Sequence, residues 1–331
     1  MQFPRRHFLH LGGAAGLGLA GFDIWPGAAR ADTYPSRVVK VEVGFPPGGG
    51  ADLATRIVSQ GLSDVWKQQV IVENRPGAGA RIALDAEAHA APDGYTLLLA
   101  PGSPLVAALL VAKLSFDPAT DFEPISLVGT YPNIIVVPNS SPFHTLQEFI
   151  AYAKAYPGKM SWASPGIGTV PHLAGELFKH MAGIEMTHVP YRGVTQGLMS
   201  DFIAGRLDLM FNTTGSLLQP VRSKQIRGLA VTSARRFADE PELPTVAECG
   251  LPGYDVTSWY GLYAPAKTPP GIIRKINGDM VAMLAKPAIK DKFKPLGIEA
   301  HGSTPQELAA KNQADAALWG PVIKEAHIRI E

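Results

Sequence analysis

The feature that most constrains this chain is a repeated order of short apolar strand, glycine-rich loop and amphipathic helix. Residues 37–45 form a β-branched run that ends at Pro46-Pro47-Gly48-Gly49-Gly50, and a helical pattern follows over residues 51–66. The same order returns over residues 160–181, with the second glycine loop at residues 165–171. Strands that alternate with helices of this length indicate an α/β fold whose parallel sheets are covered on both faces.

The length of the chain favours two lobes. The 331 residues, 46% of them apolar, are enough for about two domains with substantial cores. Two apolar segments, at residues 125–128 and 258–263, are predicted to be long strands that cross between the lobes. This division assigns residues 36–128 together with 258–331 to the first lobe and residues 129–257 to the second.

The segment 1–31 is predicted to be a twin-arginine export signal. An arginine pair at residues 5–6 precedes a mildly apolar, Gly- and Ala-rich stretch over residues 11–22, and Ala-Arg-Ala at residues 29–31 supplies a small-x-small cleavage site. The stretch is too short and too rich in glycine to span a bilayer, which takes about 20 strongly apolar residues. We expect cleavage before Asp32 and a periplasmic location.

Charge and cysteine content exclude several classes of partner. The formal net charge is +1 at pH 7 and there is no basic run, so neither nucleic acid nor anionic lipid is expected to bind. Cys249 is the only cysteine, which rules out an intramolecular disulfide and a thiolate metal cluster. We therefore expect no cofactor and no metal, and a fold stabilised by core burial.

The two glycine loops are predicted to bind an anion. Each follows a strand and precedes a helix, where unpaired N–H groups carry a partial positive charge and glycine lets a ligand approach the backbone closely. A phosphate-binding P-loop is excluded because Ala51-Asp52 stands where Gly-Lys-Ser/Thr would be needed, and the dinucleotide pattern fails because the second loop ends at Pro171. The alternative interpretation is that the glycines only form tight turns.

Patterns for catalysis are scarce. The sequence has no G-x-S-x-G elbow and no H-E-x-x-H helix. Ser164 and His172 flank the second loop and leave open a hydrolase, but without a third group they are better explained as hydrogen-bonding to a ligand or to the loop backbone. His180 and His188 are expected to be structural or exposed. Arg192, in another loop after a strand, either pairs with a second carboxylate or is solvated.

Seven sequence blocks, in order along the mature chain, resemble one family. They are FPPGGG at 45–50, VENRPGAG at 72–79, APDGYTL at 91–97, HLAGELF at 172–178, HVPYRG at 188–193, DLMF at 208–211 and LPTV at 243–246. The chain resembles the Bug family, the TctC-like solute receptors of tripartite tricarboxylate transporters.

The resemblance implies a type II-like Venus-flytrap receptor, with a sheet and flanking helices in each lobe, that closes around a small organic carboxylate. It implies a monomer without enzymatic activity that delivers its ligand to integral-membrane permease subunits, or alternatively to a sensor kinase. The implied ligand-binding residues are Phe45, Pro46, Gly48, Gly49, Gly50, Asp52, Ser103, Ser164, Gly166, Gly168, Thr169, His172, Tyr191, Arg192, Gly193 and Asn212.

The sequence departs from the family pattern where it bears on the ligand. Ile167, Val170 and Pro171 replace polar positions of the second loop, and Asn212 stands where the family usually has Asp. A less polar and less acidic cleft favours an aromatic or aliphatic acid over an amino acid. Arg81, where the family often has Asn, is a candidate to reach a second acid group.

Overall fold

The computed structural model describes residues 34–102, 106, 109, 113–193 and 196–328. The predicted export signal and Ser103 lie outside these residues. The strands are β1 Val39–Val43, β2 Val70–Asn74, β3 Thr96–Pro101, β4 Phe122–Pro138, β5 Met160–Ser164, β6 Met186–Pro190, β7 Leu209–Thr213, β8 Ile226–Val231, β9 Thr257–Pro265 and β10 Glu299–Ala300. The helices are α1 Gly50–Trp66, α2 Arg81–Ala88, α4 Leu146–Ala155, α5 Val170–Ala182, α6 Gln196–Ile203, α7 Thr214–Arg222, α8 Pro270–Leu284, α9 Pro287–Phe293 and α10 Pro305–Glu325, with 3₁₀ turns η1 Ala78–Ala80 and η2 Lys294–Leu296.

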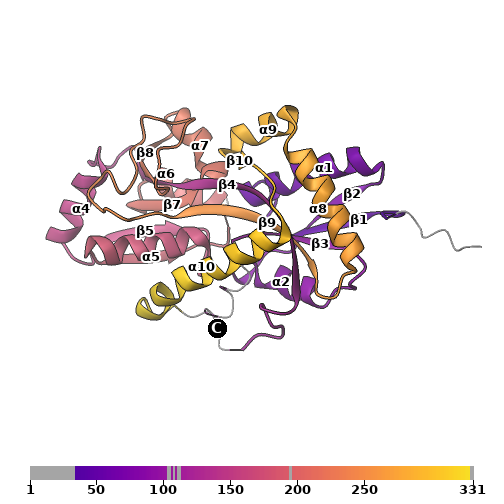
Figure 1. Ribbon diagram of the computed structural model, residues 1–331. Coiled ribbons are helices and arrows are strands. Elements are labelled where there is room, and N and C mark those ends of the chain that lie inside the picture. Colours follow the sequence, from indigo (N-terminus) through magenta and orange to yellow (C-terminus); the bar gives the residue numbers. More distant parts are fainter. Residues whose placement is uncertain (1–33, 103–105, 107–108, 110–112, 194–195, 329–331) are drawn as a thin grey trace, which may run out of the picture. The chain divides into compact units, whose positions relative to one another are not determined.

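The described strands form one mixed sheet in the order β2-β1-β3-β9-β4-β7-β5-β6, with β8 and β10 also paired to β4. The expected parallel pairing holds among β1–β3 and among β5–β7. It is wrong for β4 and β9, which pair antiparallel with each other and with their neighbours. These two strands run across the middle of Figure 1, where β4 carries the chain from the β1–β3 half of the sheet to the β5–β8 half and β9 brings it back.

Helices cover both faces of each half of the sheet. On the β1–β3 half, α1 and α8 bury one face while α2 covers the other, so that Leu97 and Leu98 belong to different cores. On the β5–β8 half, α4 and α5 cover one face and α6 and α7 the other, and Ile134 and Ile135 alternate in the same way. This alternation is the two-residue period of a strand buried on both sides.

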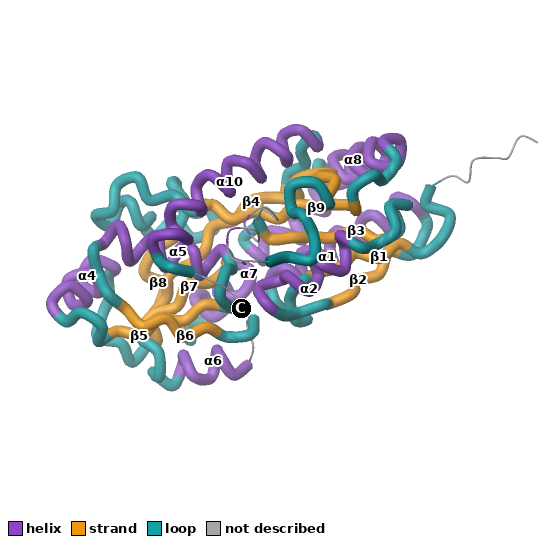
Figure 2. The backbone as a smooth tube through the Cα atoms, turned by 90° about the horizontal axis from the view of Figure 1, so that it is seen from below, coloured by secondary structure: helices purple, strands orange, loops and turns teal. Residues whose placement is uncertain are grey.

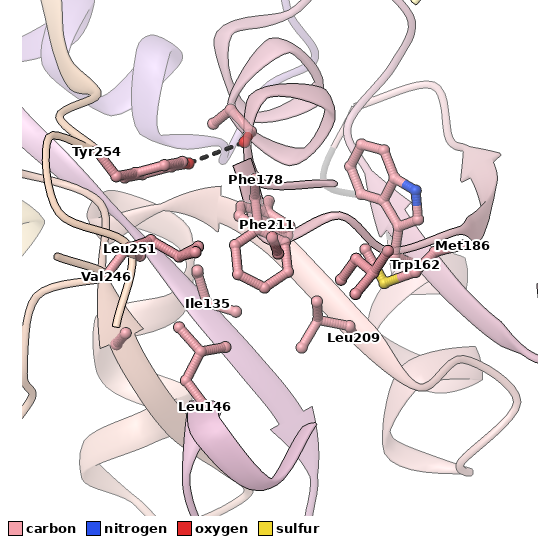
Figure 3. Close-up of a cluster of buried hydrophobic side chains, with 14 of the residues drawn as sticks. Ile135, Leu146, Trp162, Phe178, Met186, Leu209, Phe211, Val246, Leu251 and Tyr254 are labelled. Atoms are coloured by element: carbon pink, nitrogen blue, oxygen red, sulfur yellow. Dashed lines mark hydrogen bonds between the residues drawn. The ribbon is translucent and has the colours of Figure 1, made fainter. Parts of the chain in front are cut away.

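The α4–α5 core is drawn in Figure 3. Trp162 of β5 and Phe211 of β7 pack beneath α5, and the Tyr254 hydroxyl donates a 2.8 Å hydrogen bond to the Ala174 carbonyl of that helix. Trp319 of α10 joins this core, whereas Leu308 at the start of α10 joins the core beneath α2. Helix α10 therefore packs against both halves of the sheet.

Local signals predict most helices, and tertiary packing adds others. The capping box at the start of α10, Thr304 with Glu307, is present as expected. Helix α7 was not expected, because Gly215 and Pro220 lower its intrinsic helix propensity. Its buried Leu217 and Leu218 stabilise it by packing. Within the described residues, no helix combines the length and hydropathy needed to cross a membrane.

Candidate functional site

A cavity of about 110 Å³ lies at the carboxyl ends of strands β1, β3, β5 and β7. Both glycine loops line it, together with the turn before α2 and the starts of α1, α5 and α7. Open α/β sheets bind ligands at this edge, and the volume holds several water molecules or a small organic molecule. The cavity is therefore the candidate ligand site.

Three helices begin at the cavity with free amino ends. Gly49, Thr169 and Thr213 are the N-cap residues of α1, α5 and α7, and none of these helices has an N-cap side chain that accepts from its first backbone N–H groups. Each helix thus keeps backbone N–H groups for an acceptor in the cavity, and the helix dipoles add partial positive charge.

The amino ends of α1 and α7 touch. A Cβ atom on Gly215 would lie 3.0 Å from the Gly50 Cα atom, so any larger residue would crowd the two helix ends and glycine favours this approach. Figure 2 shows α1 and α7 near one another in the middle of the described chain. Two positively polarised helix ends therefore meet on one side of the cavity.

The first glycine loop is held by Asp52, a buried residue of the first turn of α1. One carboxylate oxygen accepts hydrogen bonds from the Gly48 N–H group and from Arg56 Nε, both at 2.9 Å, and the other accepts one from Asn74 Nδ2 at 2.9 Å. Burial alone would raise the pKa of Asp52, but the hydrogen bonds from Arg56, Gly48 and Asn74 hold that pKa below its ordinary value. Asp52 is thus an ionised support for the loop, outside the cavity lining.

The second loop is held by His172, the equivalent residue of α5. Its Nδ1 atom accepts a 3.1 Å hydrogen bond from the Gly168 N–H group, while the Thr169 hydroxyl donates to the Gly166 carbonyl at 2.7 Å. The imidazole stacks on His188, with ring centroids 4.2 Å apart, and His172 is 3% exposed. Burial, with the nearby charges of His188 and Lys179, lowers the pKa of His172 to about 3, so the ring is neutral.

Ser164 pairs with His188 and not with His172, its partner in the hydrolase interpretation. The Ser164 Oγ and His188 Nε2 atoms are 2.8 Å apart, and Ser164 Oγ also accepts from the Gly166 N–H group at 3.2 Å. Burial lowers the pKa of His188 to about 4. Among the described side chains no carboxylate contacts the His188 ring, so a nucleophile–base–acid arrangement is not formed there.

Asn212 presents a buried donor to the cavity. The side chain is fully buried; its Oδ1 atom accepts from the Thr213 N–H group at 2.8 Å. Among the described residues, the partner of its Nδ2 atom is the Met210 sulfur, a weak acceptor, at 4.0 Å. A ligand oxygen at this position would satisfy the amide.

The structure brings about half of the sequence-predicted site residues to the cavity wall. Those that line it are Phe45, Pro46, Gly49, Gly50, Gly168, Thr169 and Asn212. Those that do not line it are Gly48, Asp52, Ser164, Gly166, His172, Tyr191, Arg192 and Gly193. Segment 191–193 hydrogen-bonds to the second loop through the Tyr191 and Gly193 N–H groups, and Arg192 is exposed.

Several lining residues were not predicted. Tyr131 of β4 and Tyr260 of β9 stack with ring centroids 4.6 Å apart at the cavity, and Thr213 and Ser216 line it from α7. Nothing in the local sequence identifies these positions, because the long strands and α7 reach the site only through tertiary packing. Arg81, which a departure from the family pattern singles out, does line the cavity.

The rest of the wall is largely apolar. Leu84, Leu98, Leu173 and Trp319 contribute buried side chains from α2, β3, α5 and α10. Asp315 is the acidic residue of the lining, and its carboxylate accepts a 3.0 Å hydrogen bond from the Trp259 indole. Among the described residues no cluster of His, Cys, Asp or Glu is suited to hold a metal.

Comparison with known proteins places the chain among solute receptors. The profile described as "tripartite tricarboxylate transporter family receptor" (TctC) matches residues 54–328. A curated relative, the UPF0065 protein of the tcbD–tcbE intergenic region of Pseudomonas sp. strain P51, is 38% identical over 94% of this chain and 93% of its own.

Solved structures of related proteins have the same fold as this chain. The periplasmic binding protein BugD is 33% identical, with a TM-score of 0.83 over 90% of this chain and 100% of its own. R. palustris Rpa4515, solved with adipate, is 33% identical, with a TM-score of 0.85 over 89% and 99% of the two chains. MatC of Rhodopseudomonas palustris, solved with bound malate, is 29% identical, with a TM-score of 0.80 over 88% and 100%. The chain has the mixed α/β fold of periplasmic binding proteins and belongs to the TctC (Bug) family, the receptors of tripartite tricarboxylate transporters.

Proposed function

We propose that this protein captures a small organic carboxylate with an aromatic or aliphatic body and delivers it to the permease subunits of a tripartite tricarboxylate transporter. The family consists of solute-binding receptors that are not enzymes. The observation that carries the proposal is the meeting of three helix amino ends, none capped by its own N-cap side chain, at one largely apolar cavity.

The polar part of the cavity suits a carboxylate. A carboxylate accepts several hydrogen bonds at once, and the starts of α1, α5 and α7 supply backbone donors with a favourable dipole. The buried Asn212 amide adds a neutral donor where a carboxylate side chain would repel an anion. The relatives solved with adipate and malate hold ligands of this chemical class.

The apolar part suits the body of the acid. Leu84, Leu98, Leu173 and Trp319 offer no partner to a ligand ammonium group, and burying one against them, away from the Asp315 carboxylate, costs several kcal/mol or more. Hydrocarbon placed against the same surface gains about 25 cal/mol per Å² of area removed from water. We therefore expect aromatic and aliphatic acids to bind better than amino acids.

The binding test uses the mature chain, Asp32 to Glu331, recovered from the periplasm. Native mass spectrometry identifies any acid that is retained, and calorimetry compares benzoate and hexanoate with glutamate and aspartate. We expect a stoichiometric organic acid, and tighter binding of the first pair. Tighter binding of glutamate or aspartate would refute the proposed ligand class, and a bound nucleotide, metal or sugar would refute the carboxylate site.

Export and delivery are tested separately. N-terminal sequencing of the periplasmic protein should start at Asp32, and replacing the arginine pair at residues 5–6 by lysines should leave the protein in the cytoplasm. Uptake of the identified acid by intact cells should stop when the receptor gene is deleted. Normal uptake with lost transcriptional induction would instead indicate a receptor that reports to a sensor kinase.

A further inference from the structure

Arg81 is a cavity residue whose positive charge is not neutralised by the protein. It is the first residue of α2, it is partly buried, and it lines the cavity. Among the described residues its guanidinium makes no ion pair and no hydrogen bond. An arginine at the wall of a binding cavity offers five N–H donors in a fork that matches a carboxylate.

The nearest acidic residue along α2, Asp85, does not pair with Arg81. Asp85 lies four residues later on α2, the spacing at which an arginine and an aspartate usually pair. Asp85 instead accepts a hydrogen bond from the Ser115 hydroxyl. No ion pair joins Asp85 to Arg81, so the Arg81 guanidinium keeps its donors for a ligand.

Arg81 and the amino ends of α5 and α7 come from different halves of the sheet. The turn before Arg81 packs on the end of β1, where a Cβ atom on Gly44 would lie 2.3 Å from the Ala80 Cβ atom. Helices α5 and α7 follow β5 and β7 of the other half. Donors suited to an anion therefore lie in two regions of the cavity, at the helix amino ends and at Arg81.

Apolar side chains complete the same cavity. Leu84 is one turn after Arg81 on α2, and Leu98 and Leu173 face the cavity from β3 and α5. The acidic residue of the lining, Asp315, is bonded to the Trp259 indole. A ligand that reaches both of these regions would lie against these apolar side chains, so the part between its two acid groups should be hydrocarbon.

We propose that Arg81 binds a second acidic group of the ligand and thereby selects diacids with an apolar linker over the corresponding monoacids. This inference rests on the proposed function, because the first acid group must occupy the helix amino ends. Arg81 is the specificity-determining residue, and the length of the linker follows from the span between it and those amino ends.

The test is calorimetry with paired ligands on the mature protein and two variants. Succinate, adipate and suberate are compared with butyrate, hexanoate and octanoate, which have the same chain lengths and lack the second acid. The wild type should bind at least one diacid about tenfold to hundredfold more tightly than its monoacid, the range for a charged hydrogen bond. Arg81→Gln should abolish most of that preference and leave the monoacid affinity within about threefold.

Lys113→Gln is the matched control, because Lys113 lies with Arg81 beside a surface depression but outside the cavity lining. It removes an equal charge and should leave the diacid preference unchanged. Arg81→Lys should keep part of it, and thermal unfolding confirms that each variant is folded.

Three outcomes overturn the inference. The first is equal affinity for diacid and monoacid at every length in the wild type. The second is an equal loss of affinity for diacid and monoacid in Arg81→Gln, which would mean that Arg81 shapes the site without binding the second acid group. In both cases monoacid binding by the wild type leaves the proposed function intact. The third, no binding of any acid by the wild type, refutes the proposed function as well.

Discussion

The two glycine loops are built alike but held by opposite chemistry. In each, the third residue of the following helix accepts a hydrogen bond from a glycine N–H group four residues earlier: Asp52 from Gly48, and His172 from Gly168. The first support is a carboxylate neutralised by Arg56, and the second is a neutral imidazole within an aromatic stack. The comparison shows that this loop geometry requires an acceptor at that position, but not a charge.

Removing His172, the neutral support of the second loop, should lower the stability of the fold the most. His172→Ala removes a buried ring that stacks on His188 and leaves the Gly168 N–H group without its acceptor. We expect the free energy of unfolding to fall by about 2–4 kcal/mol, measured by urea denaturation. His180→Ala, at an exposed position of the same helix, should cost less than about 1 kcal/mol. Similar losses in the two variants would contradict a supporting role for His172.

Removing Asp52, the charged support of the first loop, should lower the free energy of unfolding by nearly as much. Asp52→Ala leaves the Gly48 N–H group and the Asn74 amide each short of an acceptor, and we expect a loss of about 2–3 kcal/mol in urea denaturation. Asp64→Ala, an exposed position of the same helix, serves as the control. An Asp52→Ala protein as stable as this control would show that the first loop keeps its conformation without Asp52.

The two supports should respond differently to mild acid. The folded-state pKa values of His172 and His188, about 3 and about 4, lie below the unfolded value, so the stability linked to them is present above pH 6.5 and is lost as the pH falls toward those values. Each of these two histidines should lower the free energy of unfolding by about 1 kcal/mol at pH 5.5. The lowered pKa of Asp52 acts only at lower pH, near its ordinary titration range.

The measurement is urea denaturation at pH 7.5 and pH 5.5 for the wild type and for His188→Asn. The drop in unfolding free energy between the two values should be smaller in the variant, because one neutral buried histidine has been removed. An equal drop in both proteins would mean that other groups cause the pH dependence.

The smallest expected effect concerns Thr169, the N-cap residue of α5, and is a loss of ligand affinity. Thr169 caps α5 and donates its hydroxyl to the Gly166 carbonyl, whereas Gly49 caps α1 without a side chain. Thr169→Ala should weaken ligand binding in calorimetry by about 1 kcal/mol through loss of this loop hydrogen bond. Thr169→Ser keeps the hydroxyl and should bind like the wild type. Unchanged affinity in Thr169→Ala would remove the residue from the site.

What the sequence predicts here is local, and what it misses depends on tertiary packing. Both strand–loop–helix units and the capping box of Thr304 follow from composition and spacing and are confirmed. The family resemblance implies ligand contacts for Asp52 and His172, and in the structure neither lines the cavity and each accepts a hydrogen bond from a loop glycine. A sequence pattern alone does not distinguish a residue that faces a ligand from one that supports the backbone. The antiparallel course of β4 and β9, and the contribution of α7, required the packed fold.

The contact between Gly50 and Gly215 implies that an empty cavity is electrostatically unfavourable. Two positively polarised helix ends meet there, with Asp52 as the acidic residue in the first turn of α1 only, and an anion in the cavity adds a favourable charge beside both ends. A bound acid then acts as a counter-ion that stabilises the folded chain by an amount that grows with the logarithm of its concentration. A melting-temperature screen of organic acids would therefore detect ligands through the fold itself, without a label or a transport assay.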